Sequence, residues 1–209
     1  MKRVFFTDFD GTITRTDTCV AMVEAFAADG WQEINEMWER KELSTEECAN
    51  RIFRIFNAGL EDVKKLVEAV EIDGSFKDFL AFCRGRGCRV YVLSDGYDFN
   101  IELIFKKYGI DVPYYANRMV YDGGFRIKCP YSNPDCGNCG TCKKRLMEEL
   151  RKPGEQVVYI GDGYSDTCPA AHADLVFAKE TLYRYCREKG IPVMPFDSFR
   201  DIIEAVERL

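Results

Sequence analysis

The sequence predicts an α/β fold in which a parallel sheet lies between layers of helices, with a small helical cap inserted after the first strand. Two patterns lead to this prediction. Short runs of β-branched and aromatic residues alternate with segments in which apolar residues recur at helical spacing. Between about residues 17 and 82, in contrast, helical spacing continues without a convincing strand. Strands separated by helices are typical of a parallel sheet that is buried on both faces.

The size, charge and composition of the chain restrict its class. Its 209 residues suffice for one core domain with a smaller insert, and 46% hydrophobic with 31% charged residues is the composition of a globular protein. A net charge of -6 without a basic stripe argues against nucleic acid as a partner. No apolar run is long enough to cross a bilayer, and no signal-peptide pattern precedes the first strand. We therefore expect a cytoplasmic protein without a membrane partner.

The first strand is predicted over residues 4–6, an apolar run that ends in an acidic loop. The insert that follows divides the chain into a core of residues 1–16 and 83–209 and a cap of residues 17–82. Within the cap, Ser44 and Glu47 stand in the order of a capping box, which predicts the start of a helix. A further helix is expected over about residues 60–70.

After the cap, strands and helices alternate again. Strands are predicted over residues 88–93, 112–115, 156–160 and 175–177. Helices are predicted over residues 98–108, 143–150, 181–188 and 199–209. Turn residues in the middle of the segment 118–128 predict a hairpin, and Gly109 predicts the end of the helix before it.

Acidic and polar side chains follow three of the predicted strands. Asp8 and Asp10 follow the first, Ser94 follows the strand 88–93, and Asp162 follows the strand 156–160. The carboxyl ends of parallel strands lie at one edge of the sheet, so these side chains are expected to meet there. Carboxylate oxygens are the ligands that Mg²⁺ prefers. Two aspartates after one strand also fit a solvated acidic turn, and it is the later residues that favour a metal site.

Four motifs resemble those of the haloacid-dehalogenase superfamily of phosphatases. They are DFDGT at residues 8–12, Ser94 after an apolar strand, Lys143 at the start of a helix, and GDGYSD at residues 161–166. The resemblance spans nearly the whole chain and implies a Rossmann-like core and a Mg²⁺-dependent phosphatase of small phosphorylated metabolites. Two alternatives are a phosphotransferase of the same fold and a zinc-binding or redox-sensing protein with a vestigial pocket. The complete motif set argues against the vestigial pocket.

The resemblance also implies a role for each motif residue. Asp8 is the nucleophile that forms an aspartyl-phosphate, and Asp10 protonates the leaving oxygen and later activates water. Ser94 and Lys143 neutralise phosphate oxygens. Lys143 is preferred over Lys144 because Leu146 follows it at the spacing that similar phosphatases show.

For the magnesium ion, the resemblance implies Asp8, the backbone carbonyl of Asp10, and Asp162 as ligands. Asp166 has two alternative roles. It is either a further ligand, through water, or the residue that orients Lys143.

The substrate site is less closely defined by the resemblance. The cap is similar to that of phosphoserine phosphatases, and the chain as a whole is more similar to methionine-salvage phosphatases, with likeness also to phosphoethanolamine and phosphocholine phosphatases. Asp95, between Ser94 and Gly96, departs from the Ser-Gly-Gly of the first two groups and leaves the substrate open. These three residues, with Asp17 and Arg51, are the predicted substrate site. A helix N-cap explains Asp17 equally well, and a solvated helix face explains Arg51.

Ten cysteines in a chain without a secretion signal favour metal binding over disulfides where they cluster. Four of them, Cys129, Cys136, Cys139 and Cys142, lie within residues 129–142. This spacing allows one tetrahedral Zn²⁺. An iron–sulfur cluster and free thiols are the alternatives. Because Cys142 directly precedes the predicted catalytic lysine, a structural zinc in this Cys-rich loop would fix that lysine. The sequence does not indicate an oligomeric state.

Overall fold

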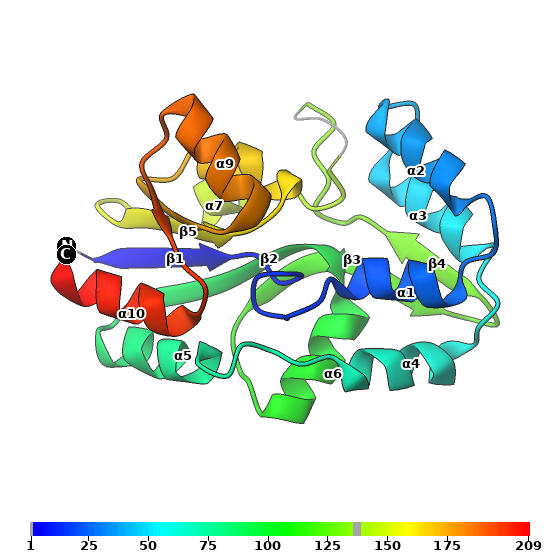
Figure 1. Cartoon of the computed structure of the whole chain (residues 1–209), viewed down its shortest axis with the longest axis horizontal. Helices are drawn as coiled ribbons and strands as arrows, with labels where there is room; N and C mark the ends of the chain where they lie inside the picture. The colour runs from blue at the N-terminus through cyan, green and yellow to red at the C-terminus, as the bar shows by residue number, and fades with distance from the viewer. Residues whose placement is uncertain (1, 136–138) are drawn as a thin grey trace.

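The computed structural model describes residues 2–135 and 139–209. Its seven-stranded sheet has the order β4-β3-β2-β1-β5-β6-β7, and every neighbouring pair is parallel except β3 with β4 (Figure 1). The strands are β1 (Arg3–Thr7), β2 (Arg89–Tyr97), β3 (Tyr114–Tyr121), β4 (Phe125–Lys128), β5 (Gln156–Gly161), β6 (Leu175–Ala178) and β7 (Val193–Pro195). The predicted α/β fold with a mostly parallel sheet is confirmed.

Helices cover both faces of this sheet. They are α1 (Thr18–Phe26), α2 (Trp31–Glu39), α3 (Thr45–Phe53), α4 (Leu60–Ala69), α5 (Phe76–Gly85), α6 (Asp98–Tyr108), α7 (Lys143–Leu150), α8 (Thr167–Ala170), α9 (Glu180–Lys189) and α10 (Phe199–Arg208). Figure 1 shows α5, α6 and α10 on one face and α7 and α9 on the other. The Ser44 side chain accepts a hydrogen bond from the Glu47 amide and begins α3 as predicted, and Gly109 ends α6 with a φ of 62°.

The central strand β1 is buried on both faces. Phe5 packs edge-on against Phe79 of α5 in one core cluster, and Phe6 stacks on Tyr91 of β2 in the other. Successive strand residues point to opposite faces, so an uninterrupted apolar run is what a strand between two helical layers requires. This burial explains why the predicted first strand lies at the middle of the sheet.

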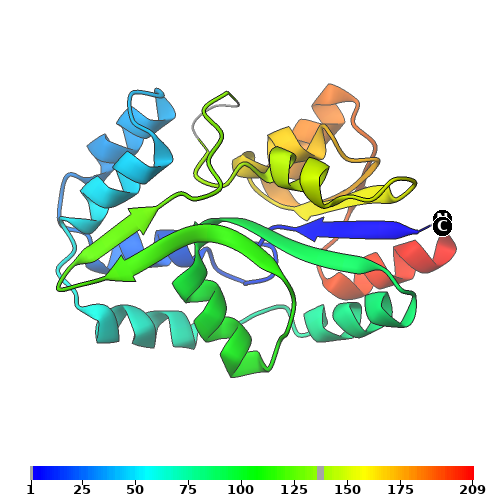
Figure 2. The ribbon, with the colours of Figure 1, turned by 180° about the vertical axis from the view of Figure 1, so that it is seen from behind.

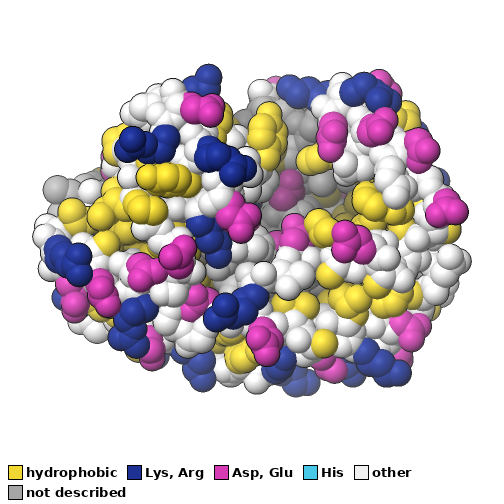
Figure 3. Space-filling view, viewed as in Figure 1, with side chains coloured by type: hydrophobic (Ala, Val, Ile, Leu, Met, Phe, Trp, Pro, Cys, Tyr) yellow, Lys and Arg dark blue, Asp and Glu magenta, His cyan; other side chains and the backbone are white. Residues whose placement is uncertain are grey.

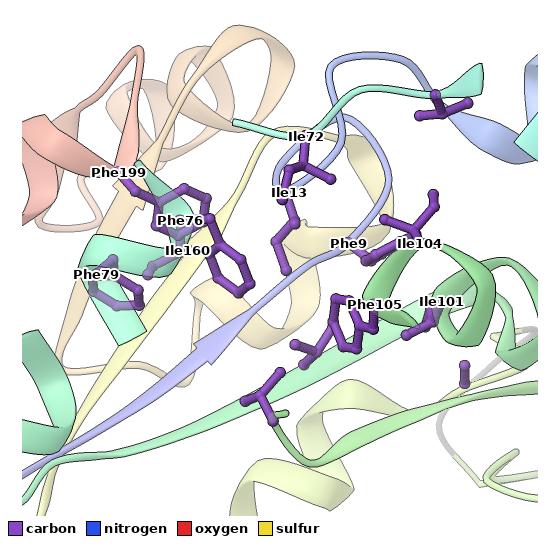
Figure 4. Close-up of a cluster of buried hydrophobic side chains, with 14 of the residues drawn as sticks. Phe9, Ile13, Ile72, Phe76, Phe79, Ile101, Ile104, Phe105, Ile160 and Phe199 are labelled. Carbon is purple, nitrogen blue, oxygen red and sulfur yellow. The ribbon is translucent and has the colours of Figure 1, made fainter. Parts of the chain in front are cut away.

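The loop after β1 is anchored in the larger core cluster. Phe9 and Ile13 are fully buried, and Figure 4 shows both among side chains from α5, α6 and α10. The amides of Thr12, Ile13 and Thr14 donate hydrogen bonds to the carbonyl oxygen of Phe9, which closes the loop into a tight turn. With these apolar side chains fixed below, the acidic residues of the loop are held above the sheet edge.

Four helices, α1 to α4, lie beyond the carboxyl end of β1, in the segment predicted to form the cap (Figures 1 and 2). The β3–β4 hairpin reaches into this region and packs against α3. Asn50 of α3 pairs with the backbone of Ile127, donating to its carbonyl and accepting from its amide, both at 2.9 Å. The cap wall therefore includes a ribbon of the core sheet as well as the inserted helices.

The predicted end of the cap at residue 82 falls inside α5. This helix packs against α10 and β2, which belong to the core. The chain returns from the cap earlier, where Thr14 and Ile72 form an antiparallel bridge and the Asp73 amide donates to Ile13. We therefore propose that the cap ends near residue 72. Helical periodicity alone does not say which layer a helix joins.

The remaining differences from the predicted elements are small. Strand β2 continues to Tyr97, so Ser94 and Gly96 lie in a strand with an irregular register and not in a loop. Only residues 114 and 115 of the predicted short strand 112–115 are in a strand, and they continue into the first arm of the hairpin as β3. Strand β7 and helices α2, α5 and α8 were not predicted. Among the described residues, no helix has the length and apolar character needed to span a membrane.

Candidate active site

Residues from three segments far apart in the sequence meet at the carboxyl edge of the sheet. Asp8 follows β1, and its amide donates to the carbonyl of Ile160 in the neighbouring strand β5. Asp162 and Asp166 lie in the loop after β5, and Lys143 begins α7. The structure thus brings together the residues of three of the predicted motifs. Figure 3 shows acidic side chains gathered around a hollow between the cap and the core.

Lys143 is the buried cation of the site. Its Nζ lies 2.6 Å from Oδ1 of Asp8 and 2.6 Å from Oδ1 of Asp166, and only 2% of its side chain is exposed. Burial alone would lower the pKa of Lys143, but the carboxylates of Asp166 and Asp8 reverse this effect and raise the pKa well above its usual value. The lysine is therefore held in its charged form, which is the form able to bind a phosphate oxygen.

Asp166 is fully buried and accepts four hydrogen bonds. Besides Lys143, the donors are the hydroxyl of Tyr159 at 2.6 Å and the amides of Asp162 and Gly163 at 3.0 and 3.1 Å. A carboxylate offers about four acceptor positions, so those of Asp166 are filled. Tyr159 was not predicted as part of the site, because a tyrosine inside an apolar strand gives no signal beyond core packing.

Asp8, Asp162 and Asp166 form a group whose carboxylate oxygens lie within 4.8 Å of one another. Burial and then the charge of Asp166 raise the pKa of Asp8, and burial raises the pKa of Asp162 to about 6, although the Thr12 hydroxyl, which donates to Asp162, opposes that rise. Crowded carboxylates with one lysine among them carry excess negative charge. The carboxylates of Asp8 and Asp162 fit a divalent cation with oxygen ligands, such as Mg²⁺.

Asp10 faces the first helix of the cap. Its Oδ1 accepts hydrogen bonds from the amide and the hydroxyl of Thr18, at 2.8 and 2.6 Å. Burial, followed by the charge of Asp17, raises the pKa of Asp10 to about 7. A raised pKa suits a group that gives and later takes a proton near neutral pH. A side chain at Gly96 would clash with Asp10, since its Cβ would lie 2.4 Å from Oδ2.

A cavity of about 410 Å³ opens above these residues. Its floor includes Asp8, Asp10, Ser94 and Asp162. Apolar side chains of the cap line much of its wall, namely Val20, Val23, Trp31, Trp38, Ala49 and Ile52. None of the lining residues that the structure describes is a lysine or an arginine. Tyr164, which is 78% exposed, lies at the mouth.

Comparison with known proteins identifies the family of this chain. Residues 3–183 match the family described as Putative Phosphatase, which is most of the chain. The chain belongs to this phosphatase family. It is a phosphoric monoester hydrolase of the haloacid-dehalogenase superfamily, as the four motifs predicted.

Curated relatives and solved structures match the phosphatase over nearly its full length. A 2-hydroxy-3-keto-5-methylthiopentenyl-1-phosphate phosphatase of Geobacillus kaustophilus (strain HTA426) is 32% identical over 211 residues, which covers 99% of this chain and 96% of the relative. One of Bacillus cereus (strain B4264) is 33% identical, covering 94% and 92%. A substrate-bound phosphoserine phosphatase structure is 20% identical with a TM-score of 0.71 and covers 98% of each chain, which confirms the fold.

The predicted substrate residues of the phosphatase are not all at the cavity. Ser94, Asp95, Gly96 and Asp17 line it. Asp17 is also the N-cap of α1 and accepts from the Val20 amide at 2.9 Å, which is the structural role given as its alternative. Its contact with substrate stays a prediction. Arg51 is not among the described lining residues; instead it forms a surface ion pair with Glu47, one helical turn away, at 2.7 Å.

The carboxylate of Asp95 holds the end of the Cys-rich loop. It accepts hydrogen bonds from the Thr141 amide at 2.8 Å and from the Asn117 side chain at 3.1 Å. A side chain at Gly140 would collide with this pair, since its Cβ would lie 2.6 Å from the amide atoms of Asn117 and 2.8 Å from Asp95. The network connects β2 and β3 to Thr141, two positions before Lys143, a link that sequence spacing did not reveal.

The zinc prediction is only partly covered by the structure, because Cys136 lies outside the described residues. Cys129 is buried, and its amide donates to the Glu46 side chain of α3. Cys139 and Cys142 lie beside Lys143 around a small cavity. Among the described side chains, no group of three metal ligands includes these cysteines. Zinc binding by this loop stays a prediction.

Proposed function

We propose that the phosphatase hydrolyses a small phosphorylated metabolite in two steps through an aspartyl-phosphate on Asp8. The observation that carries the proposal is the position of Asp8 at the floor of the cavity, with one oxygen bound to the buried ammonium of Lys143. That contact leaves the second oxygen available, while Lys143 and Ser94 offer donors for the phosphate oxygens.

In the first step, an oxygen of Asp8 bonds to phosphorus and the bond from phosphorus to the ester oxygen breaks. The electron pair of that bond stays on the ester oxygen, which takes the proton of Asp10 and leaves as an alcohol. In the second step, Asp10 takes a proton from water as the water oxygen bonds to phosphorus. The bond from phosphorus to Asp8 then breaks, which restores the Asp8 carboxylate and releases inorganic phosphate.

Asp8, Asp162 and the backbone carbonyl of Asp10 are the residues that would hold Mg²⁺. When bound, the ion supplies positive charge that offsets the charge of the phosphate group. We assign Asp166 to the orientation of Lys143 and not to the ion, because its four hydrogen bonds already fill its acceptor positions. Removal of Tyr159 or Asp166 is then expected to disturb the orientation of Lys143 before it affects binding of the ion.

The wall of the cavity favours a substrate whose organic part is apolar and carries no carboxylate. Trp31 and Trp38 offer apolar surface, and the described lining contains no cation to pair with a carboxylate away from the phosphate. The relatives from Geobacillus and Bacillus are named for a methylthiopentenyl phosphate, whose thioether chain has this character. We propose a phosphate ester of that class as the substrate, in preference to phosphoserine.

Phosphate release is the direct test. The wild type is expected to release phosphate from p-nitrophenyl phosphate with Mg²⁺ and to stop in EDTA, and a panel of phosphate esters should rank thioether and alkyl esters above phosphoserine. Asp8→Asn should abolish turnover. Asp78→Asn, an exposed aspartate of α5 paired with Arg200, is the matched control and should keep it. Turnover by Asp8→Asn, or equal rates in EDTA, would refute the proposal.

A further inference from the structure

Beneath Asp10, a buried amide of the core contacts the first helix of the cap. Asn100 of α6 is fully buried, and its Nδ2 donates to the hydroxyl oxygen of Thr18 in α1 at 2.8 Å. The same Nδ2 lies 3.3 Å from the sulfur of Met22, also in α1. Thr18 in turn contacts Asp10. Three polar groups are thus connected in a line from the core helix through the cap helix to the predicted proton donor.

The hydrogen bonds in this line run in one direction, from Asn100 through Thr18 to Asp10. A threonine hydroxyl carries one proton and accepts through its lone pairs. Since Asn100 donates to the Thr18 hydroxyl, the proton of that hydroxyl is available for Oδ1 of Asp10, 2.6 Å away. The Thr18 amide, which can only donate, also faces Oδ1. Oδ1 therefore accepts both hydrogen bonds, which leaves Oδ2 as the oxygen of Asp10 that is free to carry a proton.

The placement of Oδ2 supports this assignment. Oδ2 lies so close to the Cα of Gly96 that a Cβ there would be 2.4 Å away, and both Asp10 and Gly96 line the cavity. The oxygen left to carry the proton is thus the one beside the cavity-lining strand β2. Oδ1, in contrast, is occupied on the side of α1 by two donors of one residue.

Asn100 lowers the stability of the fold compared with an apolar residue at the same position. Its Oδ1 is buried and has no hydrogen-bond partner among the residues that the structure describes. Burying an unpaired amide carbonyl lowers stability, whereas a leucine would fill a similar volume without that penalty. What the amide provides here, and leucine would not, is the donor that fixes the direction of the Thr18 hydroxyl.

We propose that Asn100 and Thr18 are positioning residues for Asp10: together they lock Oδ1 as an acceptor and so reserve Oδ2 for the proton that the leaving group receives. The inference rests on the proposed function, because it concerns how the proton donor of that reaction is arranged. In the first step the proton passes from Oδ2 to the ester oxygen as its bond to phosphorus breaks. Without the Thr18 hydroxyl, Oδ1 loses one of its two donors and the carboxyl group is free to rotate.

The test compares two esters that differ in their need for this proton. The first ester is the best alkyl phosphate in the panel. Its leaving group is a strongly basic alkoxide unless the ester oxygen is protonated, whereas the leaving group of p-nitrophenyl phosphate is a stable phenolate. We expect Thr18→Val and Asn100→Leu to lower kcat/KM for the alkyl ester by about tenfold or more beyond any loss with the aryl ester. Thr18→Ser, which keeps the hydroxyl, should restore the alkyl-to-aryl ratio.

Ile104→Val, a shortened side chain in the core on the same helix, is the matched control for altered packing and should leave the ratio unchanged. Melting temperatures of all variants show that each is folded at the assay temperature. An equal loss with both esters, or no loss, would overturn the inference while leaving the proposed function intact. Absence of Mg²⁺-dependent phosphate release by the wild type would instead refute the proposed function, and with it the role of Asp10 as proton donor.

Discussion

Replacing Lys143 with methionine removes the charge of the buried ammonium while keeping most of the side-chain volume. In the wild type, this ammonium makes two contacts of 2.6 Å, and the side chains of its partners Asp8 and Asp166 are 8% and 0% exposed. Removing one partner of such a buried pair costs about 3–5 kcal/mol, because the remaining charge is neither paired nor hydrated. We expect Lys143→Met to lower the free energy of unfolding by an amount in this range at pH 8 in EDTA. With Mg²⁺ present, the variant should release no phosphate.

The pH dependence of the stability lost in Lys143→Met distinguishes an unpaired buried charge from a packing defect. Without the lysine, the pKa of Asp8 in the folded protein should rise further above its unfolded value, since Lys143 is what lowers it. A group that binds protons more tightly when folded makes stability fall as pH rises. The deficit of Lys143→Met relative to the wild type should therefore be smaller at pH 5 than at pH 8.

Urea unfolding followed by circular dichroism at both pH values measures this deficit. Lys144→Met is the matched control, because Lys144 is the next residue of α7, is partly exposed and makes no ion pair among the described residues. Its effect should stay below about 1 kcal/mol at either pH. Equal deficits for Lys143→Met at pH 5 and pH 8, or a stability close to that of Lys144→Met, would show that the buried charge is not what Lys143 contributes.

Three further changes test other parts of the site. Gly140→Ala should lower kcat about tenfold or more by displacing the network before Lys143, since a 1 Å misplacement of a catalytic group costs about 10²-fold, whereas Gly85→Ala, where a Cβ meets nothing within 4 Å, should not. Trp38→Ala should raise KM for the thioether ester by a factor of about ten or more, while Arg51→Ala should leave it unchanged. Protein purified without chelator should contain one zinc per chain if the loop 129–142 binds it, and zinc-free protein would exclude this role.

The meeting of Asp8, Ser94 and Asp162 at one edge of the sheet could be predicted, because the sequence indicates where each strand ends. The apolar runs before Asp8, Ser94 and Asp162 mark three strands, and in a parallel sheet their carboxyl ends must lie at one edge. Lys143 and Asp166 required the motif resemblance, since a lysine at a helix start and an aspartate in a turn are common on any surface. The core fold followed from the same alternation of strands and helices.

The residues that were missed act through contacts between distant segments. Asn100 and Thr18 are 82 positions apart, and nothing in the polar pattern of either helix marks them as a pair. Tyr159 belongs to an apolar strand, where packing of its ring is enough to explain a tyrosine. The sequence therefore gives no indication that its hydroxyl binds Asp166. Arg51 was predicted as a substrate residue, with a solvated helix face as the alternative. In the structure it lies on the surface of α3, paired with Glu47 one helical turn before it.

Strand β3 runs from the core into the cap without interruption, and this continuity has a mechanical consequence. Its first residues pair with β2, and its hairpin partner β4 is tied to α3 through the side chain of Asn50. A rotation of the cap would therefore bend the β3–β4 hairpin, because the hairpin is bound to both the cap and the core. The pairing of β2 with β3 has an irregular register between Leu93 and Tyr97, and such irregularities bend a strand, so we expect the ribbon to flex there. We expect the β3–β4 hairpin to limit the range over which the cap can rotate relative to the core. Because bending the strands costs energy, the cap should return to one preferred position.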